Sequence, residues 1–164
     1  MKTAFNVLFL CTGNSARSIL SEACLNRLGE GRFHAYSAGS QPKGEVHPCS
    51  LRLLKEKDYP TSDYRSKSWD EFEGDGVPKM DLVVTVCGNA ADETCPFWPG
   101  APMQVHWGFE DPAAAPGTED EQMPVFENIY AQIHALMERL VALPVEEMDK
   151  DELRAAMLDL TPDK

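Results

Sequence analysis

Short apolar runs alternate along the chain with longer segments whose apolar positions recur at helical spacing. The runs that predict strands cover residues 4–10, 33–38, 82–86 and 103–106. The periodic segments predict helices over residues 17–28, 47–57, 125–143 and 152–158. Strands that alternate with helices indicate an α/β fold, and the continuous apolar run at residues 82–86 is typical of a strand buried in a parallel sheet.

Two segments show neither pattern. Residues 59–79 mix Pro, Gly, Asp and Ser and predict a surface excursion. Residues 112–124 are rich in Ala, Pro, Gly and acidic residues, so they predict a mobile loop. The last predicted helices therefore follow a break in the regular alternation.

The charge distribution limits the partners of the chain. The 15 Lys and Arg against 27 Asp and Glu give a net charge of -12. From Phe109 onward 14 acidic residues stand against 4 basic ones, so the acid load lies in the last third. Nucleic acid is excluded as the main partner because phosphate contacts need a basic surface. The apolar runs are too short for a membrane span, and the N-terminus shows no secretory signal, so we expect a cytoplasmic protein whose five cysteines are free or redox-active thiols.

A cysteine, a loop of five small residues and an arginine follow the first predicted strand. The loop consists of Thr12, Gly13, Asn14, Ser15 and Ala16. At the start of a helix such a loop turns backbone N–H groups toward a tetrahedral oxyanion, and the guanidinium fork of Arg17 adds to the attraction. The same positive field is expected to lower the pKa of Cys11 and hold it as a nucleophilic thiolate, to which Ser18 is placed to donate a hydrogen bond. A buried, inert cysteine at a strand end is the alternative.

Residues 7–18, with the sequence VLFLCTGNSARS, resemble the phosphate-binding loop of the low-molecular-weight protein tyrosine phosphatases and of the arsenate reductases built on that fold. The loop does not separate the two groups. The segments at residues 85–96 and 106–113 resemble the arsenate reductases. The resemblance implies a four-stranded, mainly parallel sheet with helices on both faces. It also implies a catalytic domain over residues 1–143, followed by an acidic C-terminal helical extension over residues 144–164.

The resemblance further implies that Cys11, Cys87 and Cys95 act in sequence. Reducing As(V) to As(III) takes two electrons, so a second thiol must attack the adduct on Cys11 and leave a disulfide. Cys87 fits that role because it follows the strand at residues 82–86, at the same sheet edge as Cys11. Cys95 would then form a disulfide with Cys87 that an external reductant can reach. The alternative is that Cys87 is a buried strand-end residue and Cys95 an incidental loop residue.

The reductant that recycles the enzyme stays open. Thioredoxin, glutaredoxin with glutathione, and mycothiol each serve in some branches of the family. The segment from Cys87 to Cys95 is about one residue longer than in the thioredoxin-coupled members. We expect a monomer that binds arsenate and a thiol reductant, without a bound cofactor. No metal site is predicted, because the spacing of Cys87 and Cys95 lacks the C-x2-C pairing of structural zinc sites.

Asp111 stands before Pro112 and resembles the general acid of the family, which protonates the oxygen that leaves arsenic. A turn aspartate is the alternative for this position. His106 and Trp107 are expected to shape the wall beside this segment. A tyrosine phosphatase would be expected to carry an aromatic residue after the Asp-Pro pair, whereas residues 113–115 are all alanine. Two other functions remain open: a low-molecular-weight protein tyrosine phosphatase, and a non-enzymatic oxyanion-binding or thiol-sensing regulator.

Three polar residues and two further cysteines have expected roles. Asn14, Glu22 and Ser37 resemble a cluster that binds a potassium ion in some relatives, and here we expect a hydrogen-bond network that braces the loop without a metal. Cys24 lies on the apolar face of the first predicted helix, and Cys49 lies near the start of the second. Both are expected to be packing residues.

Overall fold

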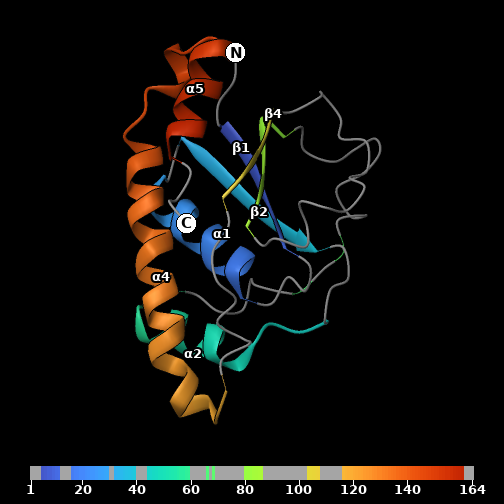
Figure 1. The fold of residues 1–164 in the computed structure, drawn as a ribbon, viewed down its shortest axis with the longest axis vertical. Coiled ribbons are helices and arrows are strands. Elements are labelled where there is room, and N and C mark those ends of the chain that lie inside the picture. Colours follow the sequence, from blue (N-terminus) through green and yellow to red (C-terminus); the bar gives the residue numbers. More distant parts are fainter. Residues whose placement is uncertain are drawn as a thin grey trace.

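Four parallel strands form a single sheet at the centre of the molecule (Figure 1). They are β1 (Phe5–Cys11), β2 (Phe33–Gly39), β3 (Leu82–Thr85) and β4 (Met103–His106), in the order β2-β1-β3-β4. The computed structural model describes residues 5–11, 16–29, 32–39, 44–59, 66, 68, 80–86, 103–107 and 116–160. The expected four-stranded parallel sheet is confirmed.

Four α-helices and a short 3-10 helix complete the described part of the fold. They are α1 (Arg17–Leu28), α2 (Pro48–Glu56), α4 (Glu119–Val141), η3 (Val145–Glu147) and α5 (Lys150–Leu160). Figure 1 shows α1 between the sheet and the long helix α4, with α2 and α5 toward opposite ends of α4. No helix in these ranges is long and apolar enough to cross a membrane.

Alternate residues of the strands contribute to two separate apolar clusters, as the pleat of a strand requires. Val7 and Phe9 of β1 lie in the main core, together with residues of α1, α2, α4 and α5. Leu8 and Leu10 belong to a second cluster on the other face of the sheet. Within the described ranges the helices pack on the first face, so the expectation of helices on both faces is tested here on one face only.

The long helix begins earlier than the sequence pattern predicts. The pattern predicts a start at residue 125, after a mobile loop, whereas α4 begins at Glu119 and contains Pro124. A proline inside a helix loses one backbone hydrogen bond. Thr118 and Glu121 form a reciprocal capping box, and three acidic residues in the first turn suit the positive end of the helix. Met123, directly before the proline, and the later apolar residues of α4 are buried. Their burial stabilises the helix and offsets the hydrogen bond lost at the proline.

The C-terminal helix α5 packs into the main core. Its buried residues Leu153, Met157 and Leu160 belong to the same apolar cluster as α1 and α4. Asp149 and Glu152 cap its start through hydrogen bonds of 2.8 Å and 3.2 Å between side chain and backbone. The helix spans residues 150–160, slightly longer than the predicted 152–158.

Candidate active site

The carboxyl ends of β1 and β3 lie side by side. Leu10 of β1 pairs with Thr85 of β3, and the Val86 backbone N–H donates to the Leu10 carbonyl at 2.9 Å. On its other side β1 pairs with β2, the next strand in the sequence. β1 therefore lies between β2 and β3 in the sheet. In an open parallel sheet this switch point is where ligands bind, beyond the carboxyl ends of the strands. Cys11 is the last residue of β1 and therefore stands at that edge.

Helix α1 begins next to this edge with a start that carries no acidic residue. Its N-cap residue, Ala16, has no side chain that can accept a hydrogen bond from the first turn, and the first turn contains neither Asp nor Glu. Arg17 and the fully buried Ser18 are the first two residues of the helix. The backbone N–H groups and the dipole of such a start favour an anion.

The structure brings together only part of the predicted site. It places the backbone of Cys11 and the residues Ala16, Arg17 and Ser18 at the end of β1 and the start of α1. Val86, which immediately precedes Cys87 in the sequence, is fully buried beside β1. The remaining predicted site residues lie outside the described residues: Thr12, Gly13, Asn14, Ser15, Cys87, Cys95 and Asp111.

A hydrogen bond joins α1 to β2 behind this edge. The buried Ser37 hydroxyl donates to the Glu22 carboxylate at 2.5 Å. Burial raises the pKa of Tyr36, and the nearby charge of Glu22 raises it further. The pair agrees with the expected bracing network, of which Asn14 lies outside the described residues. Over the ranges given above, no cluster of three or more His, Cys, Asp or Glu side chains is arranged to hold a metal ion.

The burial of Cys24 confirms that it is a packing residue. It is fully buried on α1, and the Tyr59 hydroxyl donates to its sulfur at 3.9 Å. Tyr59 also shares a hydrogen bond of 2.9 Å with the Tyr130 hydroxyl. Burial, offset in part by these tyrosines and by Arg27, raises the pKa of the Cys24 thiol to about 11. At neutral pH this sulfur is a protonated thiol, so it is not a nucleophile.

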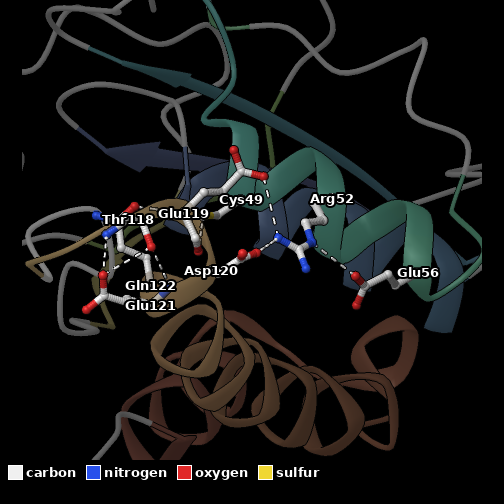
Figure 2. Close-up of polar contacts among 8 residues, drawn as sticks. All are labelled: Cys49, Arg52, Glu56, Thr118, Glu119, Asp120, Glu121 and Gln122. Carbon is white, nitrogen blue, oxygen red and sulfur yellow. Dashed lines mark hydrogen bonds and ion pairs between the residues drawn. The ribbon is translucent and has the colours of Figure 1, made fainter.

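Cys49 is a second buried packing residue, although it stands in the first turn of α2. Its single S–H is shared between the Glu119 backbone carbonyl at 3.5 Å and the Gln122 side-chain oxygen at 3.8 Å, both in the first turn of α4 (Figure 2). Burial raises the pKa of Cys49, and the carboxylates of Glu119 and Asp120 raise it further against the opposing charge of Arg52.

Arg52 links α2 to the start of α4 in a network that the sequence analysis missed. Its guanidinium lies 2.5 Å from the Asp120 carboxylate, 3.7 Å from that of Glu119 and 3.3 Å from that of Glu56. Figure 2 shows Arg52 among these three side chains. Arg52 and Glu56 stand four residues apart, a spacing that predicts an ion pair on one face of a helix. The sequence does not predict the contact with Asp120, because residues 112–124 carry the composition of a loop.

The prediction for Trp107 is wrong in one respect. Trp107 follows β4, and its backbone N–H donates to the Thr85 carbonyl at 2.8 Å. The indole does not line a wall of the site: it is fully buried, and its Nε1–H donates to the Met157 carbonyl of α5 at 3.1 Å. A buried indole N–H needs an acceptor, and a helix backbone supplies it here.

The fold agrees with the comparisons with known proteins. The family model for low molecular weight phosphotyrosine protein phosphatase matches residues 6–154, so the chain belongs to that family. Within it, the chain is similar to arsenate reductases. That of Oceanobacillus iheyensis is 39% identical over 127 residues, which are 77% of this chain and 88% of the relative. That of Bacillus subtilis strain 168 is also 39% identical over 127 residues, with the same shares of both chains.

Solved structures give the same result. The arsenate reductase of Archaeoglobus fulgidus superposes with a TM-score of 0.66 at 28% identity, and the match covers 84% of this chain and 99% of that protein. The resemblance seen in the sequence motifs is therefore confirmed. A low molecular weight protein tyrosine phosphatase from T. tengcongensis, at 22% identity and a TM-score of 0.62, shares the fold; the match covers 88% of this chain and 99% of that one.

Proposed function

We propose that this chain reduces arsenate to arsenite through a relay of cysteines that begins at Cys11. The observation that carries the proposal is the register of β1 and β3. The hydrogen bond between Val86 and Leu10 sets the residues that precede Cys87 and Cys11 on neighbouring strands, which in a sheet lie about 4.8 Å apart. The 39% identity to arsenate reductases over 77% of the chain supports the same reaction.

Oxyanion binding is the first step of the proposed mechanism. The backbone N–H groups of residues 12–16 and the start of α1 surround the arsenate, and Arg17 holds two of its oxygens in a bidentate fork. The uncapped, acid-free start of α1 supports this role, since no carboxylate of its first turn competes with the ligand. The same field holds Cys11 as a thiolate, and Ser18 donates to its sulfur.

The second step is attack by the Cys11 thiolate on arsenic. An As–S bond forms and one As–O bond breaks, while Asp111 donates the proton that lets the departing oxygen leave as water. Arsenic is still As(V) at this stage. A phosphatase would end here with hydrolysis of its phospho-enzyme by water.

The third step transfers the electrons. The thiolate of Cys87 attacks the sulfur of Cys11, and an S–S bond forms as the As–S bond breaks. The electron pair of the As–S bond stays on arsenic, which leaves as arsenite, so two thiols are oxidised for one As(V) reduced. Cys95 then attacks Cys87 by thiol–disulfide exchange and frees Cys11.

An external thiol closes the cycle by reducing the Cys87–Cys95 disulfide. Thioredoxin, glutaredoxin with glutathione, and mycothiol are the candidate donors. A structural neighbour from Corynebacterium glutamicum is called a thioredoxin-dependent arsenate reductase; at 24% identity and a TM-score of 0.57, over 96% of this chain and 64% of that one, it is a guide to the fold alone. Because the relay needs reduced thiols at the start of each turnover, we place the protein in a reducing compartment such as the cytoplasm.

Turnover assays with parallel reductants test the proposal. Reduced protein is given arsenate with thioredoxin and its reductase, with glutaredoxin and glutathione, or with mycothiol and its coupling enzymes, and arsenite is measured. An aryl phosphate is offered in a separate arm, and Cys11→Ser is the matched control. We expect arsenite in at least one arm and none with Cys11→Ser. Fast aryl phosphate hydrolysis without any arsenite would identify a phosphatase, and no turnover in any arm would favour an oxyanion-binding regulator.

A further inference from the structure

The strand β2 stands at the end of the strand order, and its sequence carries none of the residues that commonly protect the edge of a sheet. In the order β2-β1-β3-β4, β1 pairs with it on one side over all seven of its residues. These residues, FHAYSAG, include no Lys, Arg, Asp, Glu or Pro. An edge strand without charges or proline offers backbone N–H and C=O groups with which a strand of another molecule can pair. The outer side of β2 therefore needs another form of protection.

The side-chain amide of Asn26 occupies the middle of this outer side. Its Nδ2 donates to the Ala35 carbonyl at 3.1 Å, and the Ala35 backbone N–H donates to its Oδ1 at 2.9 Å. In an antiparallel pair of strands, a residue exchanges these same two hydrogen bonds with the residue opposite. The amide of Asn26 therefore takes the place that one residue of an added strand would occupy.

Backbone contacts close the same side of β2 at its two ends. The Phe33 backbone N–H donates to the Gly29 carbonyl at 2.8 Å. Gly39, which pairs with Cys11 of β1 on one side, forms an isolated parallel bridge with Ser68 on the other. The two ends are thus held by the backbone, whereas the middle is held by the side chain of Asn26, which is exposed.

The end of α1 fixes the position of Asn26 opposite β2. Gly29 follows α1 and donates its backbone N–H to the Leu25 carbonyl at 2.8 Å, while its own carbonyl accepts from the backbone N–H groups of Arg32 and Phe33. A Cβ added to Gly29 would lie 2.7 Å from a ring carbon of Phe33, so only glycine allows this close approach. The amide in the last turn of α1 is thereby held against the strand that follows.

We propose that the outer edge of β2 is a strand-pairing surface for a second copy of this chain, and that Asn26 keeps this surface closed. A second copy is the partner that fits, because it presents the same uncharged strand and two such strands pair antiparallel about a twofold axis. The net charge of -12 opposes association at long range, but salt screens it. The inference does not depend on the proposed function.

Sedimentation velocity of Asn26→Ala over a range of protein concentrations tests the inference. Arg27→Ala is the matched control: Arg27 is the next residue of α1, is also exposed, and donates hydrogen bonds of 2.9 Å and 2.8 Å to the carbonyls of Lys57 and Asp58, outside the sheet. Salt at about 0.3 M screens the net charge. We expect the native chain and Arg27→Ala to stay monomeric, and the weight-average mass of Asn26→Ala to rise at least about 1.5-fold at about 200 μM.

A second substitution in the Asn26→Ala background locates the surface. His34 is exposed on β2, and His34→Lys adds a charge to the edge strand without restoring the lost hydrogen bonds. We expect the double variant to be monomeric again, although the added lysine reduces the net negative charge that opposes association. Amide exchange of Ala35, measured by NMR in dilute protein, is expected to be at least about tenfold faster in both variants than in the native chain.

Three results would overturn the inference. A monomeric Asn26→Ala with fast exchange at Ala35 would mean that the amide only joins α1 to β2. Equal association of Arg27→Ala would identify general destabilisation as the cause. Association that persists in the double variant would place the surface elsewhere. If Asn26→Ala is insoluble, the double variant decides: a soluble monomer supports the inference, and an insoluble double variant contradicts it.

Discussion

Cys11 and Cys49 both stand beside the start of a helix, but the two helix starts differ. Cys11 ends β1 just before α1, whose N-cap is alanine and whose first turn has no acidic residue. Cys49 lies in the first turn of α2, where the His47 side chain accepts from its backbone N–H at 3.0 Å, and its thiol donates to the Glu119 backbone carbonyl in the acidic first turn of α4. The N-cap side chain and the first turn of α1 supply no acceptor or carboxylate, whereas the start of α2 is capped by His47 and lies beside the three acidic residues in the first turn of α4.

The difference shows that a helix N-terminus does not by itself make a cysteine reactive. Burial and the neighbouring carboxylates raise the pKa of Cys49, although helix dipoles alone would lower it. The capping box of Thr118 and Glu121 further satisfies the N–H groups of α4. A reactive thiolate needs a helix start that keeps its N–H groups and its positive field for a ligand, which is the role that we propose for the start of α1.

Removing each sulfur gives the largest expected contrast. Cys11→Ser is expected to abolish arsenate reduction, because a serine hydroxyl is not ionised at neutral pH and cannot pass electrons to arsenic. Cys49→Ala is expected to retain at least about half of the activity, since its thiol only packs and donates weak hydrogen bonds. Steady-state arsenite formation measures both. Equal losses in the two variants would contradict the distinction between the two helix starts.

The buried thiol of Cys24 gives a pH-dependent stability. Its pKa is raised from 9.0 to about 11 in the folded state, so the folded protein holds this proton more tightly than the unfolded chain. The contribution of this thiol to the free energy of unfolding is therefore complete below pH 9 and is lost as the pH rises toward 11. At about 1.4 kcal/mol per pH unit, the loss is about 3 kcal/mol.

Urea unfolding at a series of pH values between 8 and 10.5 measures this effect. In Cys24→Ala the fall in the free energy of unfolding over that range is expected to be smaller than in the native chain, whatever the absolute cost of the substitution. The tyrosines Tyr59 and Tyr130 have raised pKa values as well, and they contribute the remaining slope at the upper end. Identical slopes in both proteins would show that Cys24 ionises normally.

A carboxylate introduced at the N-cap of α1 tests whether this helix start binds the oxyanion. Ala16→Asp places a carboxylate at the N-cap of α1, as the first turn of α4 has naturally. We expect phosphate, used as an oxyanion that is not reduced, to bind at least about tenfold more weakly than to Ala16→Asn, which adds a cap of the same shape without the charge. Calorimetric titration gives both affinities. Equal affinities would mean that the anion is not held at this helix start.

The smallest expected effect concerns the capped start of α4. Thr118→Ala removes the capping hydroxyl of α4 and is expected to lower the free energy of unfolding by about 1 kcal/mol. Thr118→Ser keeps the hydroxyl and is the matched control. Arsenate reduction is expected to stay unchanged in both variants, because the capping box places the side chains of Thr118 and Glu121 at this helix start. A loss of activity in Thr118→Ala without a loss of stability would assign the start of α4 a role in the reaction.

The sequence carried enough information for the sheet and for the start of the site. The apolar run that ends at Cys11, the periodic segment from Arg17 and the buried run at residues 82–86 follow from patterns within a few residues. Such patterns arise because burial repeats with the period of the strand or helix. The order β2-β1-β3-β4 is known only from the structure, since periodicity does not say which strands are neighbours.

The errors arose where distant parts of the chain decide the structure. Pro124 suggested that the helix starts after it, whereas the capping box and the contact of Asp120 with Arg52 stabilise an earlier start. The indole of Trp107 binds a backbone carbonyl of α5, and nothing in the side-chain pattern of Met157 indicates that its carbonyl is an acceptor. Contacts to backbone groups far along the chain are invisible to local patterns.

Mapping the disulfides after one turnover tests the proposed relay most directly. One equivalent of arsenate is added to fully reduced protein without any reductant, and the thiols are then blocked and the peptides identified by mass spectrometry. We predict a single new disulfide between Cys87 and Cys95, a trapped Cys11–Cys87 disulfide in Cys95→Ser, and no arsenite release from Cys87→Ser. Free thiols at Cys87 and Cys95, with arsenite made only when glutathione or mycothiol is added, would contradict the relay.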